Sequence, residues 1–143
     1  MKKGYVIIAI ILIVLSTSSV FANASSYNIE GNPRYAYIMS MDTVLVINGD
    51  GNSAASIIVY PRDINTVDRI TATVTIRNLD TGNAVATWRD KPFSASQINQ
   101  TFNLNLGYRL STRGTYIMEA SISLYDGSIL RESVNITSNI ASF

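Results

Sequence analysis

The sequence predicts an all-β protein built as an antiparallel sandwich of about seven strands. Apolar and polar residues alternate with a period of two in several segments, and clusters of Gly, Asn and Asp separate these segments. No segment has a sustained helical period. The strands recur roughly every 8–12 residues, which is typical of sandwiches and barrels and not of βαβ units. Because the strands are short and uneven, an open sandwich is favoured over a closed barrel.

The N-terminal region predicts a secretory signal peptide over residues 1–24. Lys2 and Lys3 form a short basic region, an unbroken run of ten apolar residues follows, and Ala22 and Ala24 occupy the small-residue positions read by signal peptidase. An uncleaved membrane anchor is the less favoured alternative, because a spanning helix needs roughly 20 apolar residues. We therefore expect cleavage after Ala24.

Residues 25–143 are expected to form the mature protein, a single domain that begins at Ser25. The whole chain has 11 Lys and Arg and 10 Asp and Glu, and two lysines leave with the signal peptide, so the mature net charge is −1. A nearly neutral chain without a basic cluster has little attraction for nucleic acid or for an anionic membrane. We therefore expect no nucleic-acid partner, and no membrane contact after cleavage.

The chain contains neither cysteine nor histidine. Zinc, copper, haem and iron–sulfur sites take their ligands from these side chains, so we expect no metal and no cofactor. Packing and sheet hydrogen bonds must hold the fold without disulfides. Disulfide-free export is typical of bacteria, and we expect a protein secreted from a Gram-positive bacterium.

The first predicted hairpin joins Thr43–Asn48 to Ala54–Tyr60 through the turn Gly49-Asp50-Gly51-Asn52, and Pro61 ends its second strand. The turn also places oxygen ligands at alternate positions, as half of a calcium loop does. It lacks the downstream bidentate glutamate of such loops, so a hairpin turn is the favoured interpretation.

The middle of the chain predicts three more strands. Residues 70–76 alternate apolar residues with threonine, and the even-numbered residues are expected to face the core. A turn at residues 80–83 leads into a short strand, Ala84–Trp88, and Trp88 is expected to pack in the core. Residues 102–106 alternate leucine or phenylalanine with asparagine in the next strand.

The longest predicted strand begins at Tyr116. Its even-numbered residues from Tyr116 to Leu124 are apolar or small, and the odd-numbered ones are mostly polar. Asp126 and Gly127 tolerate positive φ, so they predict a type I′ turn into a last strand over residues 129–136.

The start of this strand resembles the tyrosine corner of immunoglobulin and fibronectin type III sandwiches. Leu110 and Gly114 precede Tyr116 in the segment Leu-Ser-Thr-Arg-Gly-Thr-Tyr. The resemblance implies that the phenol hydroxyl bonds back to the backbone a few residues upstream, and that Gly114 and Tyr116 are structural residues.

Most of residues 35–137 also resemble small secreted bacterial sandwich proteins of unknown function. The shared order is a threonine-rich strand, Trp88, the triplet Gly114-Thr-Tyr116, and a hairpin with Tyr-Asp126-Gly127. The resemblance implies an immunoglobulin-like sandwich and no particular activity. The chain departs from antibody domains in lacking their cysteine pair.

The sequence offers no convincing catalytic group. Asp63 and Asp68 would need a cleft and a raised pKa to act as a carboxylate pair, whereas ordinary loop carboxylates need neither. A serine nucleophile would normally need a histidine or lysine base, and Lys91 is the one lysine of the mature chain. We therefore predict that the protein is not an enzyme; a hydrolase is the least favoured alternative.

Recognition through aromatic side chains is the predicted function. Tyr35 and Tyr37 share a face if their segment is extended, and exposed aromatics grip sugars or protein partners. We expect a secreted, non-catalytic recognition or adhesion-type module that binds an extracellular protein or glycan, with these two tyrosines as ligand-binding residues. A structural or self-assembling sandwich is the alternative. Clustered exposed aromatics would favour recognition, and a long unprotected edge strand would favour self-assembly.

Overall fold

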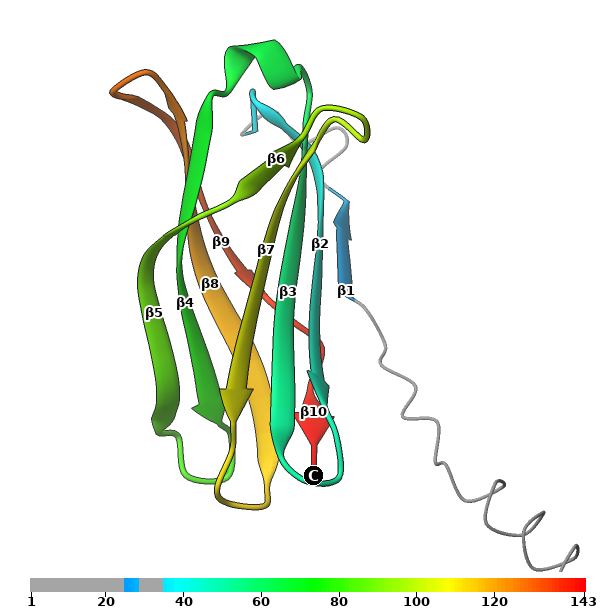
Figure 1. Ribbon diagram of the computed structural model, residues 1–143. Helices are drawn as coiled ribbons and strands as arrows, with labels where there is room; N and C mark the ends of the chain where they lie inside the picture. Colours follow the sequence, from blue (N-terminus) through cyan, green and yellow to red (C-terminus); the bar gives the residue numbers. More distant parts are fainter. Residues whose placement is uncertain (1–24, 29–34) are drawn as a thin grey trace, which may run out of the picture.

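A computed structural model describes residues 25–28 and 35–143 (Figure 1). The predicted signal peptide lies outside the described residues. The described residues form ten strands and one 3-10 helix: β1 (Ser25–Asn28), β2 (Ile38–Ile47), β3 (Asn52–Pro61), η1 (Ile64–Thr66), β4 (Arg69–Asn78), β5 (Ala84–Pro92), β6 (Ser94–Ser96), β7 (Thr101–Arg109), β8 (Thr115–Asp126), β9 (Ile129–Thr137) and β10 (Ala141–Ser142). In this part of the chain no helix is long and apolar enough to cross a membrane.

The strands form two antiparallel sheets that pack face to face (Figure 1). Sheet A has the order β1-β2-β3-β7-β6. In sheet B, β5 pairs with β4, β4 with β8, and both β9 and β10 pair with the other side of β8. The predicted antiparallel sandwich is confirmed. The strands beyond the predicted seven are β1, β6 and β10, which have four, three and two residues.

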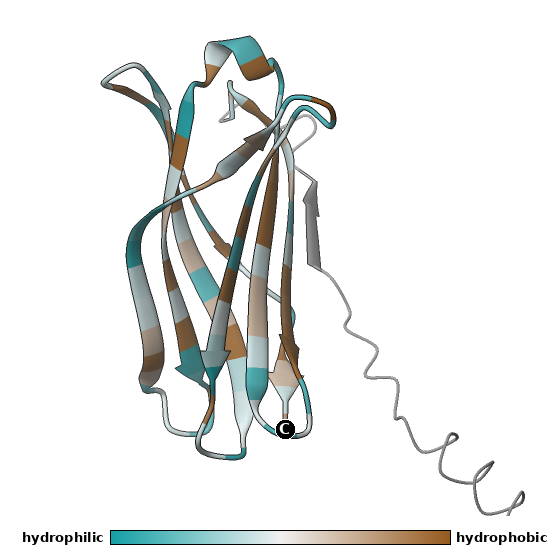
Figure 2. Cartoon of the chain, viewed as in Figure 1, coloured by the Kyte–Doolittle hydropathy of each residue, from teal (hydrophilic) through white to brown (hydrophobic). Residues whose placement is uncertain are grey.

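The core lies between the sheets and follows the alternation of the sequence. The even-numbered residues of β4 from Ile70 to Ile76, and of β8 from Tyr116 to Leu124, are all buried, as predicted. Sheet A contributes the opposite wall through residues such as Met41, Leu45 and Ile57. Figure 2 shows the resulting bands of hydrophobic and hydrophilic residues along the strands. Each large apolar side chain buried here contributes about 1.5–3 kcal/mol.

The turn between β8 and β9 differs from the prediction by one residue. Asp126 still pairs with Ile129, so the central residues are Gly127 and Ser128. Gly127 has a φ of 61°, and Ser128 is not in the positive-φ region. Positive φ at the first central residue alone defines a type II′ turn, so the type I′ prediction is wrong. One glycine is enough for this turn, and Asp126 stays in the strand, where its carboxylate accepts a hydrogen bond from Arg131 at 2.6 Å.

Strand β5 is longer than predicted because a β-bulge carries it past Trp88. Arg89 and Asp90 together oppose Thr73 of β4, and Asp90 has a φ of 49°. Beyond Pro92, the buried Phe93 links β5 in sheet B to β6 in sheet A. This segment therefore joins the two layers of the sandwich.

Tyr116 lies at the start of β8 and ties the preceding loop to the sandwich. Its ring is buried, and its hydroxyl donates a hydrogen bond to the carbonyl of Thr112, four residues upstream. This is the geometry that the tyrosine-corner resemblance implies. The Phe143 ring stacks on Tyr116 at 6.3 Å, and the Phe143 backbone pairs with that of Gly114 through N···O distances of 3.2 and 3.3 Å.

We expect Tyr116→Phe to lower the free energy of unfolding by about 1–2 kcal/mol, because it leaves the Thr112 carbonyl without its donor and keeps the ring. Urea titration measures the change. Tyr108→Phe is the matched control, since the Tyr108 hydroxyl has no hydrogen-bond partner among the described residues and the ring is 40% exposed. Equal urea midpoints for wild type and Tyr116→Phe would contradict the prediction.

Candidate functional site

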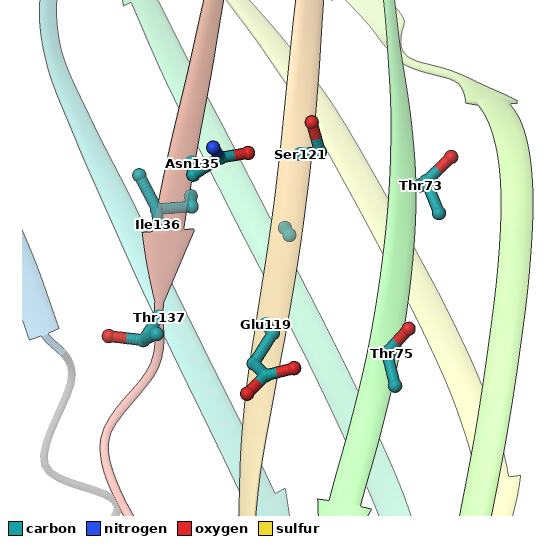
Figure 3. A pocket seen from close by; sticks show the side chains of 8 residues that line it. Thr73, Thr75, Glu119, Ser121, Asn135, Ile136 and Thr137 are labelled. Carbon is teal, nitrogen blue, oxygen red and sulfur yellow. The ribbon is translucent and has the colours of Figure 1, made fainter. Parts of the chain in front are cut away.

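The outer face of sheet B carries a shallow hollow with a volume of about 550 Å³ (Figure 3). The hollow lies over β4, β8 and β9, and most of the side chains that line it are small and polar. Its lining residues are Thr73, Thr75, Glu119, Ala120, Ser121, Asn135, Ile136 and Thr137. Ala120 and Ile136 are buried, so their side chains belong to the core and the other six form the surface.

The strand register brings these six side chains into two rows across the sheet. Neighbouring residues on adjacent antiparallel strands point to the same face, so their side chains interact directly. Figure 3 shows one row at the level of Ser121 and the next at the level of Glu119. The first row is Thr73, Ser121 and Asn135, the second is Thr75, Glu119 and Thr137, and a further register row is Thr71, Ser123 and Ser133. We call these nine residues the polar face.

The charge of the polar face is neutralised at one end. The single N–H of Arg77 Nε donates a bifurcated hydrogen bond to both carboxylate oxygens of Glu119, at 3.1 and 3.2 Å, and Nη2 donates to Oε2 at 3.0 Å. Nη1 donates to the Gly82 carbonyl at 2.8 Å. The hydrogen bonds to Glu119 and the negative charge of the Glu119 carboxylate raise the pKa of the Arg77 guanidinium. Glu119 is the one ionisable group among the described lining residues of the hollow. The hollow therefore presents hydroxyl and amide groups beside a carboxylate that is already paired.

Asp63 and Asp68, the two carboxylates considered above as a catalytic pair, each accept a hydrogen bond from a backbone amide of a turn. Asp63 Oδ1 accepts from the Asn65 amide at 2.9 Å and caps η1, whereas Asp68 Oδ2 accepts from the Gly127 amide at 2.8 Å. Neither lines the hollow on sheet B. Both are accounted for as loop carboxylates that position turns.

The glycine-rich turn after β2 has the hairpin form predicted for it. The Gly51 amide donates to the Asn48 carbonyl at 3.0 Å, and the Asp50 carboxylate accepts from Asn52 Nδ2 at 2.8 Å. Within the described ranges, no three His, Cys, Asp or Glu residues gather as metal ligands would.

Tyr35 and Tyr37 lie away from the hollow, just before β2. Both are half-buried and pack against the core. The Glu132 carboxylate of β9 accepts from the Ala36 and Tyr37 amides, each at 3.1 Å, and so links this segment to sheet B. Their ligand-binding role stays a prediction, and the structure gives both tyrosines a packing role.

The remaining aromatic residues are dispersed. Trp88 is half-buried against the core and meets Tyr108 edge to face at 6.1 Å. The Tyr60 hydroxyl donates a hydrogen bond to the Asp42 carboxylate at 3.1 Å. The pKa of Tyr60 is raised, mainly by burial and secondly by this hydrogen bond. Tyr125 lies under the Arg69 guanidinium at 4.0 Å. These rings come from different strands and do not line the hollow.

The polar face was not predicted from the sequence, although a signal for it was present. Threonines at alternate positions of residues 71–75 indicate by themselves only the solvent side of one strand. The matching serine, asparagine and threonine residues on β8 and β9 also fall at alternate positions.

No protein-family model, curated protein or solved structure matches the chain.

Proposed function

We propose that the protein is a secreted, non-catalytic recognition module that binds a neutral glycan on the polar face. The observation that carries the proposal is the hollow on sheet B, which is lined by hydroxyl and amide groups and by one paired carboxylate. In this proposal the chain is exported after cleavage at Ala24, has an immunoglobulin-like topology, and acts at the bacterial cell surface or in the medium.

The chemistry of the polar face suits sugar hydroxyls. A Ser or Thr hydroxyl both donates and accepts hydrogen bonds, and the Asn135 amide does the same with separate atoms. The side chains stand on three paired strands, so little conformational freedom is lost on binding. The volume of about 550 Å³ lies in the range of small-molecule sites, roughly 300–1,000 Å³.

The non-catalytic part of the proposal rests on the same residues. Ser121 is the serine of the hollow, and no lysine or arginine is among the described lining residues that could act as its base. Glu119 is held by Arg77, and hydrolysis of a glycoside usually needs two facing carboxyl groups. Hydrogen bonding without turnover is what this set of groups supports.

The test is binding of purified residues 25–143 to cell-wall glycans and to neutral soluble polysaccharides, at low and high salt. We expect salt to change the affinity little, because no unpaired charge lines the hollow. Ser121→Tyr places a ring in the middle of the hollow, where it would collide with a bound sugar, and is expected to weaken binding at least tenfold. Ser56→Tyr makes the same change on the outer side of sheet A and is expected to leave binding unchanged.

Two results would overturn the proposal. One is turnover of any glycan. The other is binding that survives Ser121→Tyr and is lost in the double variant Tyr35→Ala/Tyr37→Ala, with the fold verified by circular dichroism, because that result would move the site to the two tyrosines.

A further inference from the structure

One strand edge of the sandwich is open along most of β7. On one side, β3 pairs with β7 over residues 102–109. On the other side, β6 pairs only with residues 101–103. From Leu104 to Arg109, β7 therefore has a strand neighbour on one side only among the described residues. We call the unpaired side of Leu104–Arg109 the open edge.

The register identifies the backbone groups at the open edge. Leu110 continues the pairing with β3 by one residue, and its amide donates to the Gly51 carbonyl at 2.8 Å. The Tyr108 carbonyl likewise accepts a bond from Ser53 Oγ of β3 at 2.7 Å. Alternate residues of an antiparallel strand direct their N–H and C=O groups to opposite sides. The N–H and C=O groups of the three odd-numbered residues therefore point to the open edge: Asn105, Gly107 and Arg109.

The edge strands β5 and β9 carry features that disfavour strand addition over part of their length. In β5 the bulge at Asp90 is followed by Lys91 and Pro92, and in β9 the register shifts between its pairs with Leu124 and Tyr125. Bulges, lysine and proline are the usual protection of an edge strand.

The edge of β2 is covered by other means. Its residues Ser40 to Thr43 pair with β1. Further along, the side-chain amide of Asn139 bonds to both the amide and the carbonyl of Leu45, each at 2.9 Å. The open edge of β7 has neither proline nor lysine, and its register with β3 is unbroken.

The strands beside the open edge are basic. Strands β5 and β7 approach each other at the contact of Trp88 with Tyr108. Together they carry three cations, Arg89, Lys91 and Arg109, and one carboxylate, Asp90. None of these three cations takes part in the two ion pairs of the described residues, Arg77–Glu119 and Arg131–Asp126. Edge pairing between two copies would bring like charges together, which disfavours self-assembly through this edge.

A pocket of about 240 Å³ lies next to the open edge, lined in part by Val85 of β5, Tyr108 of β7 and Leu110. A strand added beside β7 would direct every second side chain to the inner side of sheet A, where Tyr108 also points. The pocket is smaller than usual small-molecule sites. Its size suits one inserted side chain.

We propose that the open edge binds an extended acidic peptide segment of another protein as an added strand of sheet A. The backbone groups of Asn105, Gly107 and Arg109 bond to the peptide backbone, the cations beside the edge attract its carboxylates, and one of its side chains enters the pocket at Tyr108. This partner and surface are separate from the glycan and the polar face.

The test uses end-blocked octapeptides of alternating Glu and Val, titrated by calorimetry into residues 25–143. We expect binding that weakens with salt and that is at least tenfold weaker for a Lys-Val peptide. A Glu-Val peptide N-methylated at alternate residues keeps the charge but cannot complete the ladder, and it is expected to bind at least tenfold more weakly. Hydrogen exchange should slow at the amides of Asn105, Gly107 and Arg109 when the Glu-Val peptide is bound.

Gly107 allows a matched pair of protein variants. Gly107→Pro removes an amide that points to the open edge, without removing a bond to β3, and should weaken binding of the Glu-Val peptide at least tenfold. Gly107→Ala keeps that amide, and its Cβ would lie 3.8 Å from the nearest atom, the Ser53 oxygen, so binding should stay within twofold. Circular dichroism and the urea midpoint verify the fold of both variants.

Three results would overturn the proposal: no binding of the Glu-Val peptide, equal affinity for its N-methylated form, or a dimer of the protein alone that Gly107→Pro dissociates. The N-methylated peptide keeps the test decisive if Gly107→Pro fails to fold. Ser121→Tyr should leave peptide binding unchanged, so a failure of the glycan proposal and a failure of this one are distinguishable.

Discussion

Replacing Gly51 with alanine is expected to lower the free energy of unfolding by roughly 3–5 kcal/mol, because backbone strain and a steric collision act together at this position. Gly51 has a φ of 84°, which costs a residue with a Cβ about 1–3 kcal/mol. The new Cβ would also lie 2.6 Å from the Leu110 carbonyl oxygen and 2.9 Å from the Phe143 ring. The carbonyl cannot move away easily, because Leu110 is bonded to Gly51 through its own amide.

Two other glycines separate the causes of this loss. Gly82→Ala places a Cβ in open space at a φ of 75°, so it is expected to show the backbone cost alone. Gly49→Ala, in the same turn as Gly51, has open space and no positive φ, so its effect is expected to stay within about 0.5 kcal/mol. Urea unfolding of the three variants measures these differences. A Gly51→Ala loss no larger than that of Gly82→Ala would mean that the collision with Leu110 relaxes freely.

Asn139→Ala is expected to cost about 2–4 kcal/mol. The substitution removes the partner of both the amide and the carbonyl of Leu45, and each partly buried group left unpaired costs about 1–3 kcal/mol. Ile140→Ala is the control, because that side chain is 61% exposed and its loss should change stability by less than about 0.5 kcal/mol. Thermal and urea unfolding measure both. A cost for Asn139→Ala below that of Ile140→Ala would show that water replaces the amide at Leu45 without penalty.

The parts of the fold that depend on local alternation could be predicted from the sequence. The inward residues of β4 and β8 were identified because a strand buried on one face must alternate. Contacts between distant segments could not be predicted this way. Asn139 and Leu45 are 94 residues apart, and nothing near either residue indicates that a side-chain amide substitutes for a strand partner. The short strands β6 and β10 likewise exist only because longer strands offer them an edge.

The candidate site was harder to predict than the fold, because it depends on strand order. Thr73, Ser121 and Asn135 form a row only once β4, β8 and β9 are known to be neighbours in register. For Tyr35 and Tyr37, alternation could not distinguish exposed from half-buried rings, since their burial depends on contacts with the core and on the Glu132 carboxylate. Tyr116 was easier to assign, since its corner is formed within four residues of chain.

Trp88 is the single tryptophan of the chain, and it stands half-buried and perpendicular to Tyr108 where β5 approaches β7. All of the indole emission of the protein therefore originates next to the open edge. Occupation of that edge would change the polarity around this one fluorophore while the sandwich stays folded. A ligand on the polar face, on the outer side of sheet B, would leave the emission spectrum unchanged. The molecule thus contains an optical reporter that distinguishes its two proposed surfaces without any label.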